Sequence, residues 1–267
     1  MISQKDVTIT IPHLGETKEQ EYSFNECYAS LRESTPEIRI VVSKNGAACF
    51  HPRDVRIVGQ GQCKAVNAAV AITNTPWIMV SNDDMIYPPG WWDRFNEIGL
   101  DSKSCISPRL VEPRDGAPTF IKYFCGGAGG DFDKQKFFDF ANKHSEKGWR
   151  NGFNLPFLIR RELWDLVGGY DINYDPWGSN SDSDLLYKIK LVGAHPMQNT
   201  NCLVYHFSQT SGTFESQNQE YWHKNFAYFE QKWGFPRTDE GIWEATFDIP
   251  NEGRKYRPFW EGYYAKS

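Results

Sequence analysis

The sequence predicts an α/β fold with a mainly parallel central sheet flanked by helices, and two observations support it. Short apolar or β-branched runs recur along the chain, as is typical of buried strands. Segments with the i, i+3, i+4, i+7 spacing of amphipathic helices separate these runs. Strands that alternate with helices form right-handed βαβ units, which build a parallel sheet. A length of 267 residues corresponds to one large domain or two small ones.

Each element is marked by its own residues. The segment from Val7 to Pro12 is β-branched and closed by proline, the pattern of a strand. The apolar spacing over 24–31 predicts a helix, which Pro36 ends. By the same criteria, further strands are expected over 38–42, 55–59, from 77, over 105–110, 154–159 and 201–206. Further helices are expected over 63–70, 89–100, 132–145, 161–167, 181–192 and 216–233.

Composition and charge exclude several classes of partner. The net charge is −5 and no block of like charge occurs, so nucleic acid and anionic membranes are not expected partners. The six cysteines form no CxxC pair, which argues against zinc and for buried free thiols in a reducing compartment. No apolar run is long enough to span a bilayer, and residues 1–6 lack the apolar stretch of a signal peptide. We expect a soluble cytoplasmic protein, and the pattern does not define an oligomeric state.

The run that starts at Trp77 ends in three oxygen-bearing side chains, Asn82, Asp83 and Asp84. Carboxylates directly after a buried strand suit a hard cation, because Mg²⁺ and Mn²⁺ prefer oxygen ligands. Acidic residues are also common in turns. Asp83 and Asp84 alone are therefore also consistent with a solvent-exposed turn that binds no metal. The carboxyl ends of parallel strands meet at one edge of a sheet, where ligands bind. We therefore expect His13, Ser43, residue 59 and this acidic group to face one crevice.

Taken in order, these features resemble inverting family 2 of the nucleotide-sugar glycosyltransferases with the GT-A, Rossmann-like fold. The resemblance covers about residues 6–234. It rests on the segments Ile11–His13, Ala65–Ala71, Ile78–Gly90, Ser107–Leu110, Leu158–Glu162, Gly168–Asp171, Asp182–Leu185, Val204–His206 and Lys232–Gly234.

The resemblance implies roles for residues on the donor side. Asn82 and Asp84 fall at the outer positions of a DxD motif, with Asp83 between them. Asp84 is then the principal ligand of Mn²⁺ or Mg²⁺, and His206 is a third contact to the metal or the diphosphate. From the residues alone, His206 is a strand-end histidine with local hydrogen bonds.

Further donor-side residues follow from the same resemblance. Pro12, His13 and Asn67 fall where the family lines the nucleotide pocket. Ser43 or Asn45 stands where the family usually has an aspartate that recognises the nucleotide, which leaves the base undefined.

On the acceptor side the resemblance implies a catalytic base. Asp182 falls at the second residue of the family's Glu-Asp motif, but Ser181 replaces the glutamate, so Asp184 stays an alternative. One of the two carboxylates is also explained by helix capping. Trp177 and Gly178 are expected to contact the acceptor, although a single tryptophan is equally typical of a core.

The function implied is metal-dependent, inverting transfer of a hexose from a nucleotide-diphosphate sugar, with UDP the expected nucleotide, to a hydroxyl of a saccharide, as in polysaccharide biosynthesis. Residues 1–110 would bind the nucleotide sugar, 111–214 the acceptor within the same domain, and 215–267 would form a helix and an aromatic tail. The alternative is a non-catalytic sugar- or nucleotide-binding module, which Asn82 and Ser181 favour. A nucleotidyltransferase is disfavoured, because no basic Gly-rich loop follows the first strand.

Overall fold

The structure is a computed structural model that describes residues 1–45, 55–57, 61–97, 101, 103–208, 210, 216–237 and 241–246. The helices are α1 (Lys18–Ser34), α2 (Gln62–Ala71), α3 (Trp91–Phe95), α4 (Lys134–His144), α5 (Arg161–Val167), α6 (Ser181–Leu191) and α7 (Gln219–Trp233). The strands are β1 (Val7–His13), β2 (Arg39–Asn45), β3 (Val55–Ile57), β4 (Trp77–Val80), β5 (Met85–Ile86), β6 (Ser104–Glu112), β7 (Ile121–Lys122), β8 (Trp149–Asn151), β9 (Phe157–Arg160) and β10 (His195–His206). Short 3-10 turns are η1 (Gln4–Asp6), η2 (Ile172–Tyr174) and η3 (Ser216–Asn218).

The strands of the described residues belong to one sheet, in the order β3-β2-β1-β4-β9-β6-β10-β5, with β7 beside β6 and β8 beside β10. The pairs β1–β2, β1–β4, β2–β3, β6–β7 and β6–β10 are parallel. Strand β9 runs antiparallel between β4 and β6, and β5 and β8 run antiparallel to β10. The predicted mainly parallel sheet is confirmed, and its strands come from both halves of the chain.

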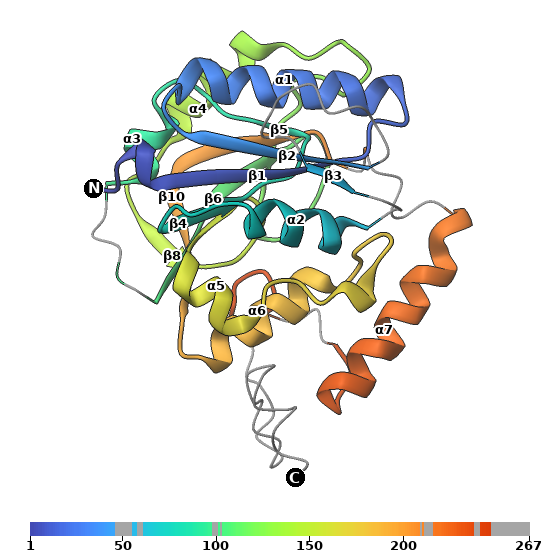
Figure 1. Ribbon diagram of the computed structural model, residues 1–267. Helices are drawn as coiled ribbons and strands as arrows, with labels where there is room; N and C mark the ends of the chain where they lie inside the picture. Colours follow the sequence, from blue (N-terminus) through green and yellow to red (C-terminus); the bar gives the residue numbers. More distant parts are fainter. Residues whose placement is uncertain are drawn as a thin grey trace.

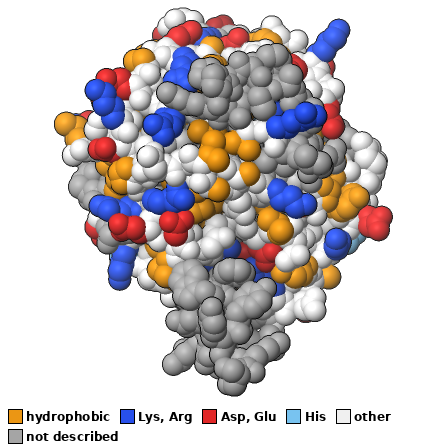
Figure 2. All heavy atoms as spheres, in the orientation of Figure 1, with side chains coloured by type: hydrophobic (Ala, Val, Ile, Leu, Met, Phe, Trp, Pro, Cys, Tyr) orange, Lys and Arg blue, Asp and Glu red, His pale blue; other side chains and the backbone are white. Residues whose placement is uncertain are grey.

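Helices cover both faces of this sheet (Figure 1). Helices α1, α3 and α4 lie on one face, and α2, α5 and α6 lie on the other, while α7 stands at the end of the second layer. Positive and negative side chains are mixed over the face drawn in Figure 2, in keeping with the balanced composition. The layers place the carboxyl ends of β1 and β4 next to the start of α6 (Figure 1).

Burial on both faces explains the composition of the central strands. Ile9 and Ile78 are fully buried, and so are Thr8 and Thr10, which flank Ile9 in β1. The two threonines satisfy their hydroxyls inside the core, Thr8 with the Thr75 hydroxyl at 2.7 Å and Thr10 by donating to the Met79 carbonyl. A buried polar group with a partner costs far less than one without, so these β-branched residues are tolerated there.

The structure corrects several predicted boundaries. The last strand begins at His195 rather than at 201, since β8 and β6 pair with its first half. The run from Trp77 divides into β4 and β5, because the acidic segment between them turns out of the sheet. Helix α3 ends at Phe95, several residues before the predicted end. Strand β3 is described only to Ile57, and the predicted site at residue 59 lies outside the described residues.

The described cysteines are free and buried, as predicted; they are Cys27, Cys63, Cys105, Cys125 and Cys202. Cys49 and most of the aromatic tail lie outside the described residues. Within the described part of the chain, none of the helices combines the length and the apolar character needed to cross a membrane.

Candidate active site

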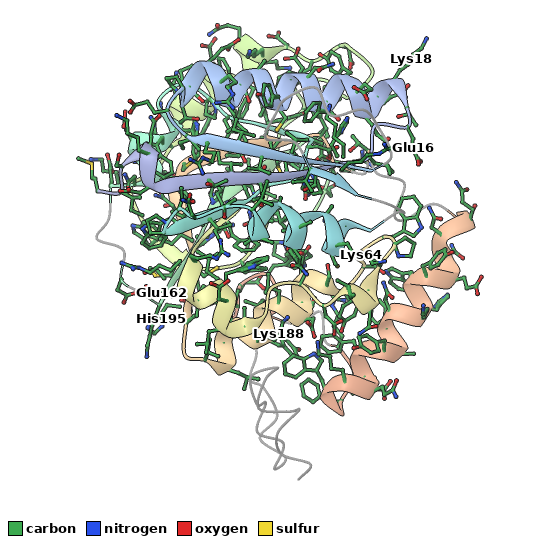
Figure 3. The ribbon with its side chains drawn as sticks, in the orientation of Figure 1. Glu16, Lys18, Lys64, Glu162, Lys188 and His195 are labelled. Carbon is green, nitrogen blue, oxygen red and sulfur yellow. The ribbon has the colours of Figure 1, made fainter. Side chains whose placement is uncertain are left out.

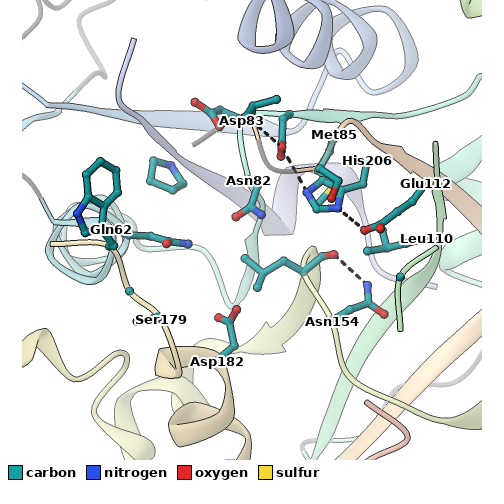
Figure 4. Close-up of a pocket in the computed structure, with 18 of the residues that line it drawn as sticks. Gln62, Asn82, Asp83, Met85, Leu110, Glu112, Asn154, Ser179, Asp182 and His206 are labelled. Carbon is teal, nitrogen blue, oxygen red and sulfur yellow. Dashed lines mark hydrogen bonds and ion pairs between the residues drawn. The ribbon is translucent and has the colours of Figure 1, made fainter. Parts of the chain in front are cut away.

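A cavity of about 580 Å³ opens at the carboxyl edge of the sheet. Its walls come from the ends of β1, β4, β6 and β10, from the loop before α6 and from the first turn of α6 (Figure 4). The predicted site residues that line it are Pro12, His13, Asn82, Asp83, Asp84, Trp177, Gly178, Asp182 and His206. The expectation that strand ends converge on one crevice is therefore met for β1 and β4, and the end of β10 reaches the same crevice.

Asp84 and His206 form a charged corner of this cavity. His206 Nε2 lies 3.3 Å from Asp84 Oδ2, and Thr210 donates to the same oxygen at 2.9 Å. Burial raises the pKa of Asp84, but the charge of His206 and the hydrogen bonds from His206 and Thr210 outweigh it and hold the pKa below its usual value. Burial lowers the pKa of His206, but the paired Asp84 and Glu112 raise it to about 10.

This corner has a donor set that fits a hard divalent cation. Asp84 Oδ1 is buried and has no hydrogen-bond partner among the described residues, although buried polar atoms are nearly always paired. A carboxylate and a neutral imidazole are ligands of Mn²⁺, so a cation bound here would displace the proton from His206 Nε2. The described residues contain no group of three or more His, Cys, Asp or Glu side chains that could hold a metal ion. A cation here would therefore complete its coordination with water or with the phosphates of a substrate.

Asp83 is held beside this corner by His13. Its Oδ2 lies 2.7 Å from His13 Nδ1, and Glu21 lies 3.3 Å from the other ring nitrogen. The His13 ring stacks on Phe24 with centroids 4.0 Å apart. Burial raises the pKa of Asp83, while the hydrogen bond from His13 lowers it. These contacts fix the backbone that carries Asn82 and Asp84.

Asp182 lies on the opposite wall, in the first turn of α6, and its carboxylate points into the cavity (Figure 4). Tyr170 donates a hydrogen bond of 2.7 Å to its Oδ1. Burial raises the pKa of Asp182 to about 6, while the Tyr170 hydrogen bond and the charge of Arg237 act in the opposite direction. A half-buried carboxylate with this pKa is ionised at neutral pH and is able to accept a proton.

Asp184 faces away from the cavity into a buried charged network. It pairs with Lys232 at 2.7 Å and with Lys188 at 3.5 Å, and Trp233 donates to it at 2.9 Å. Lys188, labelled in Figure 3, is a buried residue of α6. Lys232 also pairs with Asp171, at 2.7 Å. This network ties α7 to α6 and to the loop that precedes it.

Ser43 and Asn67, two of the predicted nucleotide contacts, do not line the cavity. The Ser43 hydroxyl donates to the Ala65 carbonyl at 2.7 Å and is fully buried. The Asn67 amide donates to the Tyr170 carbonyl at 2.8 Å and accepts from the Tyr170 N–H at 3.0 Å. The Asn45 side chain lies outside the described residues. Asn67 thus holds the backbone of the tyrosine that contacts Asp182.

The loop with Trp177 and Gly178 is fixed against the start of α2. The Asp175 carboxylate accepts from the N–H groups of Cys63 at 2.9 Å and Lys64 at 3.2 Å, and so caps α2 from outside the helix. Gly178 has φ +69°, and a Cβ there would lie 2.7 Å from Gln62 Oε1. The left-handed backbone at this position favours glycine.

Sequence reasoning missed Glu112, Tyr170 and Arg237. Glu112 accepts from His206 Nδ1 at 2.7 Å and is buried at the end of β6. A carboxylate that directly follows an apolar run was the signal used for Asp84, and it applies equally here. Tyr170 and Arg237 carried no such signal, because only the folded chain brings them to Asp182.

No family model and no curated protein matches this sequence. Its structure is similar to that of a mannosyltransferase from Pyrobaculum calidifontis, solved with GDP-Man and Mn²⁺ (13% identity, TM-score 0.53, 85% of this chain and 64% of that one). It is also similar to GalNAc-T7, solved with UDP, GalNAc and Mn²⁺ (14% identity, TM-score 0.53, 87% of this chain and 52% of that one). The chain thus spans roughly half to two thirds of the length of these proteins. It has the GT-A fold that both structures share.

Proposed function

We propose that this protein is a metal-dependent, inverting glycosyltransferase that moves a hexose from a nucleotide-diphosphate sugar, with UDP the expected nucleotide, to a hydroxyl of a saccharide. One observation carries the proposal. The corner of Asp84 and His206 and the carboxylate of Asp182 face the same cavity from opposite walls. Both structural neighbours were solved with Mn²⁺ and a nucleotide or nucleotide sugar, which supports the donor class.

On the donor side, Asp84 and His206 would hold Mn²⁺ or Mg²⁺, with Asn82 and Asp83 beside the sugar nucleotide. When bound, the cation supplies positive charge opposite the departing diphosphate. The orphaned Asp84 Oδ1 and the oxygen and nitrogen donors of this corner support this assignment. His13 and Pro12, at the end of β1, would contact the nucleotide.

On the acceptor side, Asp182 would be the general base. An acceptor hydroxyl is a weak nucleophile, and a carboxylate that takes its proton during attack typically contributes about 10²–10⁴-fold in rate. Attack by that hydroxyl in a single displacement inverts the anomeric centre. Asp184 is the weaker candidate for this role, because its carboxylate is paired with Lys188 and Lys232. Trp177 would stack on the acceptor ring, with Gly178 beside it.

A panel of nucleotide sugars tests the proposal. Each compound is added with Mn²⁺, and thermal unfolding and donor hydrolysis are measured together. A bound donor raises the apparent stability, so we expect one donor to raise the melting temperature and to be hydrolysed slowly. Stabilisation without turnover, even with saccharide acceptors present, would instead favour a sugar-binding module. The buried free thiols fit a reducing compartment, and we propose a cytoplasmic setting.

A further inference from the structure

Glu112 stands directly behind His206 as a consequence of strand register. Strands β6 and β10 are parallel, and Val111 pairs with Tyr205. The next residues along the two strands are therefore neighbours at the same edge of the sheet. The contact is direct, since Glu112 Oε1 lies 2.7 Å from His206 Nδ1.

Glu112 is buried and closely packed at the end of β6. The residue is 4% exposed, and its backbone carbonyl accepts from the Tyr123 N–H at 2.8 Å. Gly116 packs over its second oxygen, because a Cβ at Gly116 would lie 2.7 Å from Glu112 Oε2. A carboxylate held on a strand and covered by a close backbone approach has little freedom to leave the imidazole.

This contact sets which ring nitrogen of His206 faces the cavity corner. A carboxylate accepts hydrogen bonds, so Nδ1 carries the hydrogen that points to Glu112. Nε2 then lies toward Asp84, 3.3 Å from Oδ2. Histidines that bind metals usually donate their other N–H to a carboxylate or carbonyl, which fixes the tautomer and raises ligand basicity.

We infer that Glu112 is a positioning residue, which orients the His206 imidazole so that Nε2 is presented to a divalent cation held with Asp84. The inference rests on the proposed function for the presence of a cation. Glu112 would affect metal binding through its hydrogen bond to His206, without contacting the cation itself. Loss of such a partner typically costs about 10- to 100-fold in metal affinity.

The test is a titration of the full chain with Mn²⁺ alone, in which electron paramagnetic resonance detects the free ion. We expect Glu112→Ala to weaken Mn²⁺ binding by about 10- to 100-fold. Glu112→Gln, which keeps a carbonyl acceptor for Nδ1–H, should lose less. Circular dichroism checks that each variant is folded. If the Glu112→Ala protein does not fold, the near-isosteric Glu112→Gln protein provides the test. Asp139→Asn, which removes an exposed carboxylate on α4, should bind like the parent.

A double-mutant comparison separates positioning from a general structural effect. In a His206→Ala background, Glu112→Ala should cause no further loss of Mn²⁺ affinity, because the residue through which it acts is gone. Unchanged affinity in the Glu112→Ala protein overturns the inference and leaves the proposed function standing. A full loss in the His206→Ala background also overturns it, since Glu112 would then act without the imidazole. A parent protein that binds no Mn²⁺ overturns the metal site itself, and this inference with it.

Discussion

The two walls of the cavity give their carboxylates opposite environments. At the strand ends, Asp84 lies beside the His206 imidazole, and this partner keeps its pKa below the usual value. At the start of α6, Asp182 has a tyrosine hydroxyl as its partner and no ion pair among the described residues. There burial dominates and raises the pKa to about 6.

This difference suits two different tasks. A carboxylate kept ionised beside an imidazole is a stable ligand for a cation. A carboxylate whose pKa lies near the working pH is able to take up a proton and release it again. Groups whose surroundings push their pKa values apart commonly divide the roles of a reaction, and Asp84 and Asp182 are such a pair.

The largest expected effect comes from removing one member of this pair at a time. Asp84→Asn should abolish transfer and also Mn²⁺-dependent donor binding, because the principal ligand is lost. Asp182→Asn should lower kcat by about 10²–10⁴-fold while donor affinity stays within a few-fold of the parent. Donor titration and single-turnover assays on both variants measure this. Full activity in the Asp182 variant would refute its assignment as the base.

Substitution of Asp184 tests whether Asp182 and Asp184, in one helical turn, have separate roles. Asp184→Asn leaves the buried Lys188 and the largely buried Lys232 without their shared counter-charge. Breaking a buried pair in this way typically costs about 3–5 kcal/mol of unfolding free energy. We therefore expect a large loss of stability in urea unfolding, with kcat reduced much less than by Asp182→Asn at temperatures where the variant is folded. A stable but inactive Asp184→Asn protein would move the base to Asp184.

The smallest expected effect is a shift in the pH dependence of the rate, which tests the surroundings of Asp182. The base must be ionised, so the rate should fall as pH drops through about 6, the pKa of Asp182. Tyr170 stabilises the ionised form by its hydrogen bond, and Arg237 does so by its charge. Tyr170→Phe should therefore raise the pKa further and move the acid limb of the kcat profile to higher pH. A limb that stays in place would show that another group controls it.

Much of the cavity wall formed by the strand ends could be predicted from the sequence. Apolar runs that end in polar side chains predicted that His13 and Asp84 face one crevice, because parallel strands end at one edge of a sheet. The role of His206 came from the family resemblance, since its residue pattern alone indicated a strand-end histidine with local hydrogen bonds. The same rule would have identified Glu112, which ends β6. It was less reliable for Ser43, whose hydroxyl is used by the Ala65 carbonyl inside the core.

The cavity wall formed by the start of α6 could be predicted less well. Asp182 and Asp184 are two residues apart in the same helical turn, and their sequence positions alone do not say which one reaches the cavity. The partners that separate them, Tyr170 for one and Lys232 for the other, come from different segments.

The sequence by itself determined the α/β class, the order of most elements and the strand ends that carry polar groups, because these follow from local spacing of apolar residues. Tertiary structure alone decided which carboxylate faces the cavity, that Asn67 holds Tyr170, and that Glu112 supports His206. Those outcomes depend on strand register and on contacts between distant segments, which set burial and charge around each group, and local sequence patterns do not encode them.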